Sequence, residues 1–194
     1  RCSGHVISSK HSGETVNPIF GDCMAGAGET YARHGYEMML TRVDADGEAD
    51  AYRNLKARGA VDGVVVHAPC MDDARLPVLH EIDLPFVVHG RASGTNTPYD
   101  WLDVNNRRAF HDAAQYLLDL GHSRIALING HEDMDFAMRR RTGFEDAMRA
   151  AGIEIDPELM VAGEMTEGHG YRNAQRMLGH HVPPTAFLVS SILS

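Results

Sequence analysis

The strongest constraint on the fold is a regular alternation between short runs rich in β-branched residues and longer helical stretches. Strands and helices that alternate in this way form βαβ units, in which right-handed crossovers join parallel strands. The sequence therefore predicts an α/β fold with parallel sheets. The predicted strands cover 4–9, 36–41, 61–68, 85–89, 124–129, 159–162 and 185–191. The predicted helices cover 18–34, 47–58, 73–82, 105–120, 135–151 and 168–179.

The alternation is interrupted once and then begins again. Residues 90–100 contain Gly, Pro, Ser and Asn, which favour a loop, and we interpret this segment as a crossover between two lobes. The first lobe is predicted to cover 1–102 and the second 103–194. The second segment ends directly after a strand, with no helix to cover the last face of its sheet, so we expect an incomplete lobe. The first residue is not Met, so we also expect sequence upstream.

The charge balance restricts what the chain can bind. Lys and Arg number 18 against 27 Asp and Glu, and the formal net charge is −9. Domains that grip a phosphate backbone usually carry a basic excess, because neutralisation of phosphates supplies most of their affinity. Nucleic-acid binding by this chain alone is therefore disfavoured.

Cysteine usage and hydropathy indicate the compartment. Cys2, Cys23 and Cys70 are odd in number and form no CxxC pair, which fits a reduced cytoplasmic protein better than a disulfide scaffold. No apolar run is long enough to span a bilayer, and residues 1–10 lack the apolar core of a signal peptide. These features predict a cytoplasmic protein without membrane contact.

Three consecutive arginines occupy the predicted helix 135–151. Arg139 lies four residues after Asp135, and Arg141 lies four residues before Glu145, so both can form ion pairs along the helix surface. Asp135, Glu145 and Asp146 neutralise the triplet, which disfavours a nucleic-acid patch.

Arg140 differs from its two neighbours. Phe136 and Phe144 lie four residues away on either side, and no acid is available to it along the helix. These positions belong to an apolar stripe of the kind that faces a core. A buried guanidinium needs partners, and two interpretations remain open. One is structural, with an acid from another element or a side chain that reaches water. The other is a planar fork that binds the oxygens of a ligand.

Two motifs in the second half of the chain are specific. They are "LLDLGHSRIALI" (117–128), of the pattern LxxLGHxRIAxI, and "RRTGFEDAMRAAG" (140–152). Upstream, "NPIFGDCMAGAGETYARHGYEMMLT", "VDGVVVHAP" and "LPFVVHGR" follow in the matching order. Together these segments, which cover nearly the whole chain, resemble the LacI/GalR transcriptional regulators. The resemblance implies a periplasmic-binding-protein-like fold of two flavodoxin-like lobes, with a ligand cleft at their strand ends.

The resemblance also implies which residues contact the ligand. Arg140 falls on the arginine that clamps ligand oxygens in this family, with Phe136 one helical turn before it. Asn17 and Phe20 match the segment that opens the first helix of the first lobe, although Phe20 could equally belong to the core. His89 ends a strand where the cleft lies, but a lone histidine is also compatible with a structural role.

Other matching positions depart from the family or have a second interpretation. Met165 replaces an aromatic residue that often lines the sugar. Asp103 and Asn105 match the crossover, where Asp103 can contact the ligand or form hinge hydrogen bonds and Asn105 can cap the next helix. Ser191 and Ile192 stand where the family commonly carries an Asn-Asp pair that receives sugar hydroxyls. The loss of that acidic acceptor leaves the ligand class open.

No catalytic or metal-binding motif is present in the sequence. There are 12 histidines but no HExxH motif, and GxSxG, Walker and GxGxxG motifs are also missing. We therefore expect no enzymatic activity, no cofactor and no metal.

These observations predict the effector-binding part of a LacI-type transcriptional regulator, a repressor. A helix-turn-helix headpiece upstream would bind operator DNA, and a small polar effector, in the first place a sugar, would control it. The resemblance implies a homodimer with helix 18–34 on the dimer surface. The segments "VVHGR" and "LVSSILS" resemble regulators of sugar or α-glucoside uptake. The alternative is a secreted sugar-binding protein of the same fold that serves a transporter.

Overall fold

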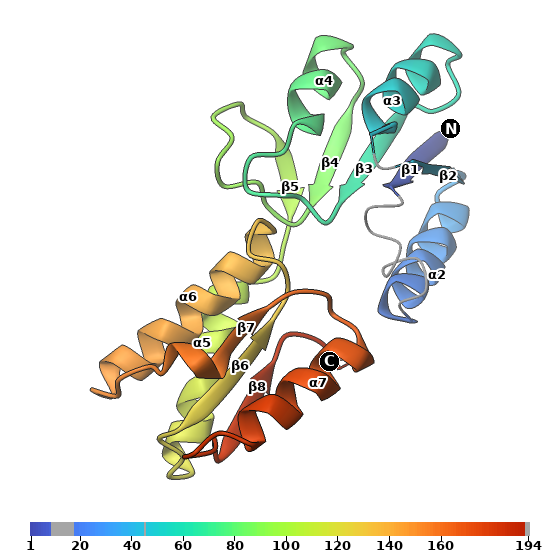
Figure 1. Cartoon of the computed structure of the whole chain (residues 1–194). Helices are drawn as coiled ribbons and strands as arrows, with labels where there is room; N and C mark the ends of the chain where they lie inside the picture. Colours follow the sequence, from blue (N-terminus) through green and yellow to red (C-terminus); the bar gives the residue numbers. More distant parts are fainter. Residues whose placement is uncertain (9–17, 45, 193–194) are drawn as a thin grey trace. The chain divides into compact units, whose positions relative to one another are not determined.

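The computed structural model describes residues 1–8, 18–44 and 46–192 (Figure 1). Internal contacts divide the chain into two compact units, Arg1–Asp103 (unit 1) and Val104–Ser194 (unit 2). Each unit is described by itself.

Unit 1 contains a five-stranded parallel sheet with strand order β2-β1-β3-β4-β5 (Figure 1). The strands are β1 (Cys2–Ser8), β2 (Glu37–Val43), β3 (Gly63–His67), β4 (Phe86–His89) and β5 (Asp100–Leu102). The helices described in this unit are α2 (Pro18–Arg33), α3 (Glu48–Ala57) and α4 (Arg75–Glu81).

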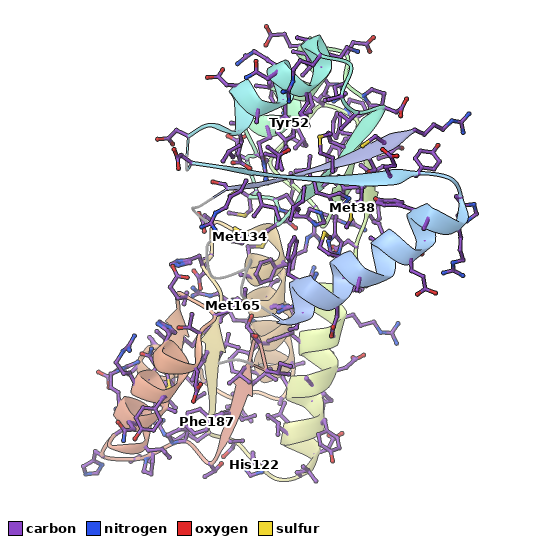
Figure 2. All side chains as sticks on the ribbon, turned by 90° about the vertical axis from the view of Figure 1, so that its right-hand side faces the viewer. Met38, Tyr52, His122, Met134, Met165 and Phe187 are labelled. Atoms are coloured by element: carbon purple, nitrogen blue, oxygen red, sulfur yellow. The ribbon has the colours of Figure 1, made fainter. Side chains whose placement is uncertain are left out.

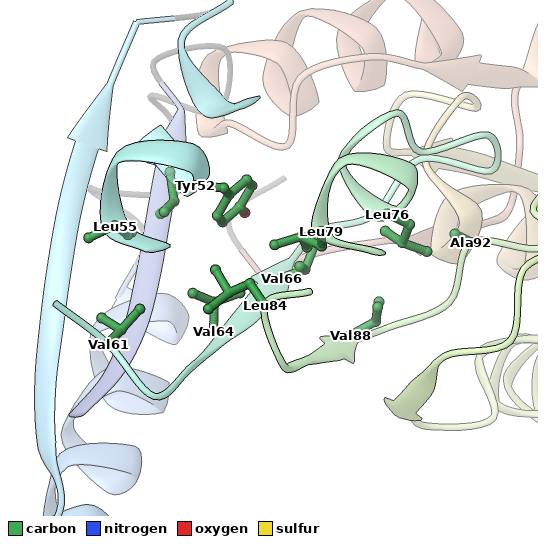
Figure 3. Packing of buried hydrophobic residues seen from close by; sticks show 11 residues of the cluster. Tyr52, Leu55, Val61, Val64, Val66, Leu76, Leu79, Leu84, Val88 and Ala92 are labelled. Atoms are coloured by element: carbon green, nitrogen blue, oxygen red, sulfur yellow. The ribbon is translucent and has the colours of Figure 1, made fainter. Parts of the chain in front are cut away.

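One face of this sheet forms the hydrophobic core of unit 1. Side chains alternate between the two faces along a strand, and Val6, Val64, Val66 and Val88 point to the same face. Burial of each aliphatic side chain there stabilises the fold by about 1.5–3 kcal/mol. Figure 3 shows the residues from α3, α4 and the following loop that pack on these valines: Tyr52, Leu55, Leu76, Leu79 and Leu84.

The opposite face of the sheet carries histidines and packs against α2. His5, His67 and His89 alternate with the core valines and therefore point away from them. The parallel register pairs His67 directly with His89, and it pairs His5 with Val65, two residues before His67. Met38 of β2 lies beside α2 on this face (Figure 2).

Unit 2 contains a parallel sheet whose described strands lie in the order β7-β6-β8. The strands are β6 (Ile125–Asn129), β7 (Met160–Ala162) and β8 (Ala186–Val189). The helices are α5 (Asn106–Asp119), α6 (Asp135–Ala150), α7 (Glu167–Leu178) and the short 3-10 helix η2 (Pro157–Leu159).

Helices cover both faces of the unit 2 sheet, because the strand residues on both faces are apolar. On one face Leu127 packs with Phe110 of α5 and Phe144 of α6. On the other face Ile128 packs with Met177 of α7. This arrangement explains why the first four residues of β6, IALI, form an unbroken apolar run rather than an alternating one.

The structure confirms the α/β class and the parallel sheets that the sequence predicts. The predicted helices and strands occur in the predicted order, with ends shifted by a few residues; the last residue of predicted strand 4–9 lies outside the described residues. The sequence does not predict β5, which begins at the last residue of the predicted loop. All three of its side chains are exposed, so no alternation marks it, yet its backbone pairs with β4.

Candidate functional site

Arg140 lies on α6 and is held in place by hydrogen bonds to two other elements. Its Nε donates to Oδ1 of Asn106, at the start of α5, over 2.8 Å. Its Nη1 donates to the backbone oxygen and the Oγ of Ser190, directly after β8, over 2.6 and 3.1 Å. The planar guanidinium is therefore fixed at the carboxyl end of β8.

Two aromatic rings lie beside this guanidinium, and a methionine contacts the serine that binds it. The guanidinium carbon Cζ lies 4.9 Å from the ring centroid of Phe136 and 5.2 Å from that of Phe110, within the range of cation–π interactions. Ser190 Oγ lies 3.5 Å from Sδ of Met165, in the loop after β7 (Figure 2). Arg140, Phe136, Met165 and Ser190 are each half-buried. We call these four residues the arginine cluster.

Glycine at the end of β6 leaves room for the arginine cluster. A Cβ atom at Gly130 would lie 3.2 Å from Cζ of Phe136 and 3.4 Å from Sδ of Met165. A larger residue there would press on both side chains, because such contacts are tighter than ordinary van der Waals distances. The cluster thus collects at the carboxyl ends of β6, β7 and β8, which is where open α/β sheets tend to bind ligands.

The two flanking arginines form the ion pairs that the helical spacing predicts. Arg139 pairs with Asp135. Arg141 pairs with Glu145 over 2.7 Å and also with Glu132 over 2.6 Å. Their positive charges are therefore balanced within unit 2.

The predicted site residues of unit 1 that the structure describes lie on or beside the same sheet. Phe20 of α2 is half-buried and meets His67 edge-on, with 5.5 Å between ring centroids. His89 is exposed at the carboxyl end of β4. The Asp103 side chain lies 3.7 Å from Nε of Arg91. Asn17 lies outside the described residues.

Two further predicted residues lie at a helix start and a strand end. Asn105 caps α5, since its side chain accepts a hydrogen bond from the backbone N–H of Arg108. Ser191 is half-buried and follows Ser190, which is the serine that binds Arg140.

A row of hydrogen-bonded histidines in unit 1 is not predicted from the sequence. Nδ1 of His5 lies 2.8 Å from Nε2 of His67, and Nδ1 of His67 lies 3.3 Å from Nδ1 of His89. At the other end, the hydroxyl of Tyr31 on α2 lies 3.3 Å from Nε2 of His5. We call His5, His67 and His89 the histidine row. The strands "VVVH" and "FVVH" both end in histidine, and this repetition is the signal that could reveal the row.

The interior of the histidine row is neutral at physiological pH. His5 is 1% exposed and His67 is 8% exposed. Burial, together with the nearby His5, His89 and Arg75, lowers the pKa of His67 to about 3. Burial also lowers the pKa of His5. Each of these two rings therefore carries one N–H and one bare nitrogen.

The neutral state of His67 predicts acid sensitivity. The unfolded chain protonates His67 near its ordinary pKa of 6.5, whereas the folded chain does not do so until about pH 3. Below pH 6.5 the unfolded state therefore binds more protons, and falling pH favours unfolding. We expect His67 to account for a loss of about 2 kcal/mol in unfolding free energy between pH 7 and pH 5.

Urea denaturation at the two pH values measures this loss. His67→Phe should show a smaller loss than the unsubstituted chain, while the exposed histidine variant His34→Gln should not differ from it. Equal losses in all three proteins would contradict the prediction.

A buried arginine supports the strand end that carries His67. Arg75 donates from Nε to Asp73 over 2.9 Å and from Nη1 to Glu48 over 3.0 Å. Its Nη2 donates to the backbone oxygen of His67 over 3.0 Å and to that of Ala68, which has a positive φ of 46°. The guanidinium thus ties the end of β3 to the loop before α4 and to the first turn of α3.

Unit 1 also has a polar cavity of about 880 Å³ away from the histidine row. It lies between the end of β2 and α3, and its lining includes Thr41, Arg42, Asp50, Asn54 and Arg58. We call it the β2–α3 groove. It contains no residue that the sequence analysis singles out.

Metal ligands and membrane spans are two further features that bear on function. Among the residues that the structure describes, no group of three His, Cys, Asp or Glu side chains could hold a metal ion. None of the described helices has both the length and the apolar composition needed to cross a bilayer.

Comparison with known sequences identifies the family. The family described as "Periplasmic binding proteins and sugar binding domain of LacI family" matches residues 12–191. The HTH-type transcriptional regulator AglR of Rhizobium meliloti (strain 1021) is 42% identical over 172 residues, which cover 89% of this chain and 48% of AglR. The chain spans about half the length of the curated relatives it matches. These relatives are transcriptional regulators.

Solved structures agree with this match. A regulatory protein of the LacI family from Chloroflexus aggregans superimposes with a TM-score of 0.83 at 25% identity, covering 97% of this chain and 67% of that one. A complex of the transcriptional regulator CelR with cellobiose gives a TM-score of 0.82 at 27% identity, covering 99% of this chain and 59% of that one. The chain belongs to the family of periplasmic binding proteins and LacI-type sugar-binding domains.

Proposed function

We propose that this chain is the effector-binding part of a LacI-type transcriptional repressor and that its effector is a small sugar. The observation that carries the proposal is the arginine cluster. A guanidinium is fixed by Asn106 and Ser190 beside an aromatic ring, at the carboxyl ends of three parallel strands. This is the position at which α/β folds of this kind receive small polar molecules.

The chemistry of the arginine cluster suits a sugar. Guanidinium N–H groups donate to hydroxyl and ring oxygens, and the apolar surfaces of Phe136 and Met165 can pack on the C–H faces of a pyranose. The similarity to the CelR–cellobiose complex supports a saccharide of this size. In unit 1, His89 and Phe20 offer a hydrogen-bonding ring and an aromatic edge at the carboxyl end of the sheet. We propose that both are ligand-contacting residues, as are Asn17, Asp103 and Ser191.

The proposed regulatory role rests on the relatives and on the charge. AglR and the other matched regulators are about twice as long as this chain and are of the helix-turn-helix type. We propose that a headpiece outside this chain binds operator DNA as part of a cytoplasmic homodimer, in which α2 contributes to the dimer surface. A net charge of −9 fits a domain that leaves DNA contact to another part of the protein. The sugar would then change operator affinity by favouring one arrangement of the domain.

A thermal-shift measurement with a sugar panel tests the proposal. Suitable members are cellobiose, maltose, sucrose, trehalose and raffinose. A sugar at one hundred times its Kd should stabilise the folded chain by about 2.7 kcal/mol and raise Tm accordingly. If none of them moves Tm at millimolar concentration, the sugar assignment is wrong.

Substitution of Arg140 then locates the site. Arg140→Lys keeps the charge but loses the planar fork, and we expect the sugar to bind about tenfold to a hundredfold more weakly. Arg108→Lys is the matched control, because Arg108 is exposed and pairs only along its own helix with Asp112 among the contacts described. Titration calorimetry would reject the assignment if both variants bound the sugar as tightly as the unsubstituted chain.

A further inference from the structure

We propose that His5 and His67 are positioning residues that fix the proton of His89 on Nε2, so that His89 donates a hydrogen bond to a ligand oxygen. This inference rests on the proposed function, because it gives His89 a ligand to contact. The observation behind it is the unbroken set of contacts from Tyr31 through the histidine row.

The row begins at a strong donor. The Tyr31 hydroxyl receives a hydrogen bond from Oγ of Ser3 over 3.2 Å and lies 3.3 Å from Nε2 of His5. A phenol, with a pKa near 10, gives its proton to a hydrogen bond far more readily than a neutral imidazole N–H does. Tyr31 is therefore the donor in this contact, and Nε2 of His5 is the bare, accepting nitrogen.

The direction of each later hydrogen bond then follows. His5 carries its single proton on Nδ1 and donates it to Nε2 of His67, 2.8 Å away. His67 in turn carries its proton on Nδ1 and donates it to Nδ1 of His89, 3.3 Å away. His89 is left with its proton on Nε2, which has no hydrogen-bond partner among the residues that the structure describes.

The residues packed around His5 and His67 stabilise these N–H positions. The rings of His5 and His67 stack with 5.1 Å between centroids, and the edge contact with Phe20 shields His67 on the α2 side. Arg75, which binds the backbone oxygen of His67, also pairs with Asp73 and Glu48. A second proton on His67 would be buried near the positive charge of Arg75 and is therefore disfavoured. A change in the hydrogen bonds at either end of the row should therefore change which ring nitrogen carries the proton, while the net charge of the row stays the same.

The consequence is a preference among ligands. A fixed Nε2–H donates only to a group with a lone pair, such as a hydroxyl, ether or carboxylate oxygen. A ligand with an ammonium group at that position would bind more weakly, because the ammonium N–H groups and the His89 N–H are all donors and none can accept. The row thereby adds specificity at the end of β4 that His89 alone, free to take either tautomer, would lack.

Nitrogen-15 NMR of histidine side chains tests the order directly, in the free chain and without knowledge of the ligand. We expect His5 and His67 to be protonated on Nδ1 and His89 on Nε2. In Tyr31→Phe, which removes the donor at the start of the row, all three should become mixtures of tautomers. The control Tyr36→Phe removes the hydroxyl of a neighbouring tyrosine that lies outside the row and should change nothing. Any other tautomer for His5 or His67 in the unsubstituted chain overturns the proposal.

Affinity for the sugar selected by the panel tests the link to the ligand. Tyr31→Phe should bind it about threefold to tenfold more weakly, and Tyr36→Phe as tightly as the unsubstituted chain. Equal affinity in Tyr31→Phe overturns the positioning role even if the tautomers are as expected. If no sugar binds the unsubstituted chain, the proposed function is wrong, and so is the ligand contact of His89. The NMR spectra would still show which ring nitrogen of each histidine carries the proton.

Discussion

Replacement of Arg75 by methionine should lower the unfolding free energy by about 3–5 kcal/mol at pH 7, because it leaves buried carboxylates without their partner. The Asp73 side chain is only 4% exposed, and Glu48 is 16% exposed. Burial by itself would raise the pKa of Asp73, but hydrogen bonds and charge from Arg75 hold it below its ordinary value. The variant also frees the backbone oxygens of His67 and Ala68, which Arg75 binds.

The pH dependence of this variant has a definite sign. In the unsubstituted chain the pKa of Asp73 is lowered, so its stabilising contribution is present above the ordinary pKa and is lost as pH falls through the folded value. Without Arg75, burial favours the protonated acid, and the penalty should shrink between pH 7 and pH 4. Arg53→Met is the control, since Arg53 forms only exposed pairs with Asp50 and Glu81 among the described contacts and should cost less than about 1 kcal/mol. Similar urea midpoints for the two variants would contradict the described network.

Replacement of Gly143 by alanine should destabilise unit 2 by about 3 kcal/mol. A Cβ atom there would clash with the carbonyl oxygen of Arg107 and would lie 3.0 Å from the backbone nitrogen of His111. Both are backbone atoms of α5, so the clash can be relieved only if the two helices move apart and expose Phe110 and Phe144.

A second glycine provides the control for this substitution. Gly26 lies within α2, and a Cβ atom added there would have nothing within 4 Å, so Gly26→Ala should be neutral or stabilise by about 0.5–1 kcal/mol. Urea denaturation followed by circular dichroism measures both effects. A Gly143→Ala chain as stable as the unsubstituted one would show that α5 and α6 do not pack in this register.

Local pattern predicts most of the fold but not the partners of its polar side chains. The β-branched runs and the helix-ending glycines suffice for the order of elements, because each depends on residues that are neighbours in the chain. Strand β5 is not predicted from the sequence, because its three residues are all exposed and show no alternation. It is recognised only by its backbone pairing with β4. Helical spacing identifies Arg140 as the arginine without an acid on its own helix. Asn106 and Ser190, which hold it, are 34 and 50 residues away and cannot be found by spacing.

The histidine row shows the same limit in unit 1. His5 and His67 are 62 residues apart, and His67 and His89 are 22 apart, so their contact depends on strand order and register. Once β1, β3 and β4 are known to be adjacent and parallel, the alignment of the two strand-end histidines follows. Taken singly, each histidine is more simply interpreted as structural, and only the register shows that they form a row.

The most direct test of the proposed binding site is amide hydrogen exchange of the chain with and without the sugar selected by the panel. Ligand contact at the strand ends should slow exchange at Gly130, in 163–166, at Ser190 and around His89, because bound ligand shields and rigidifies these backbone segments. The β2–α3 groove should exchange at an unchanged rate. Slowed exchange confined to that groove, or no change at the strand ends, would contradict the assignment of the arginine cluster and His89 as the effector site.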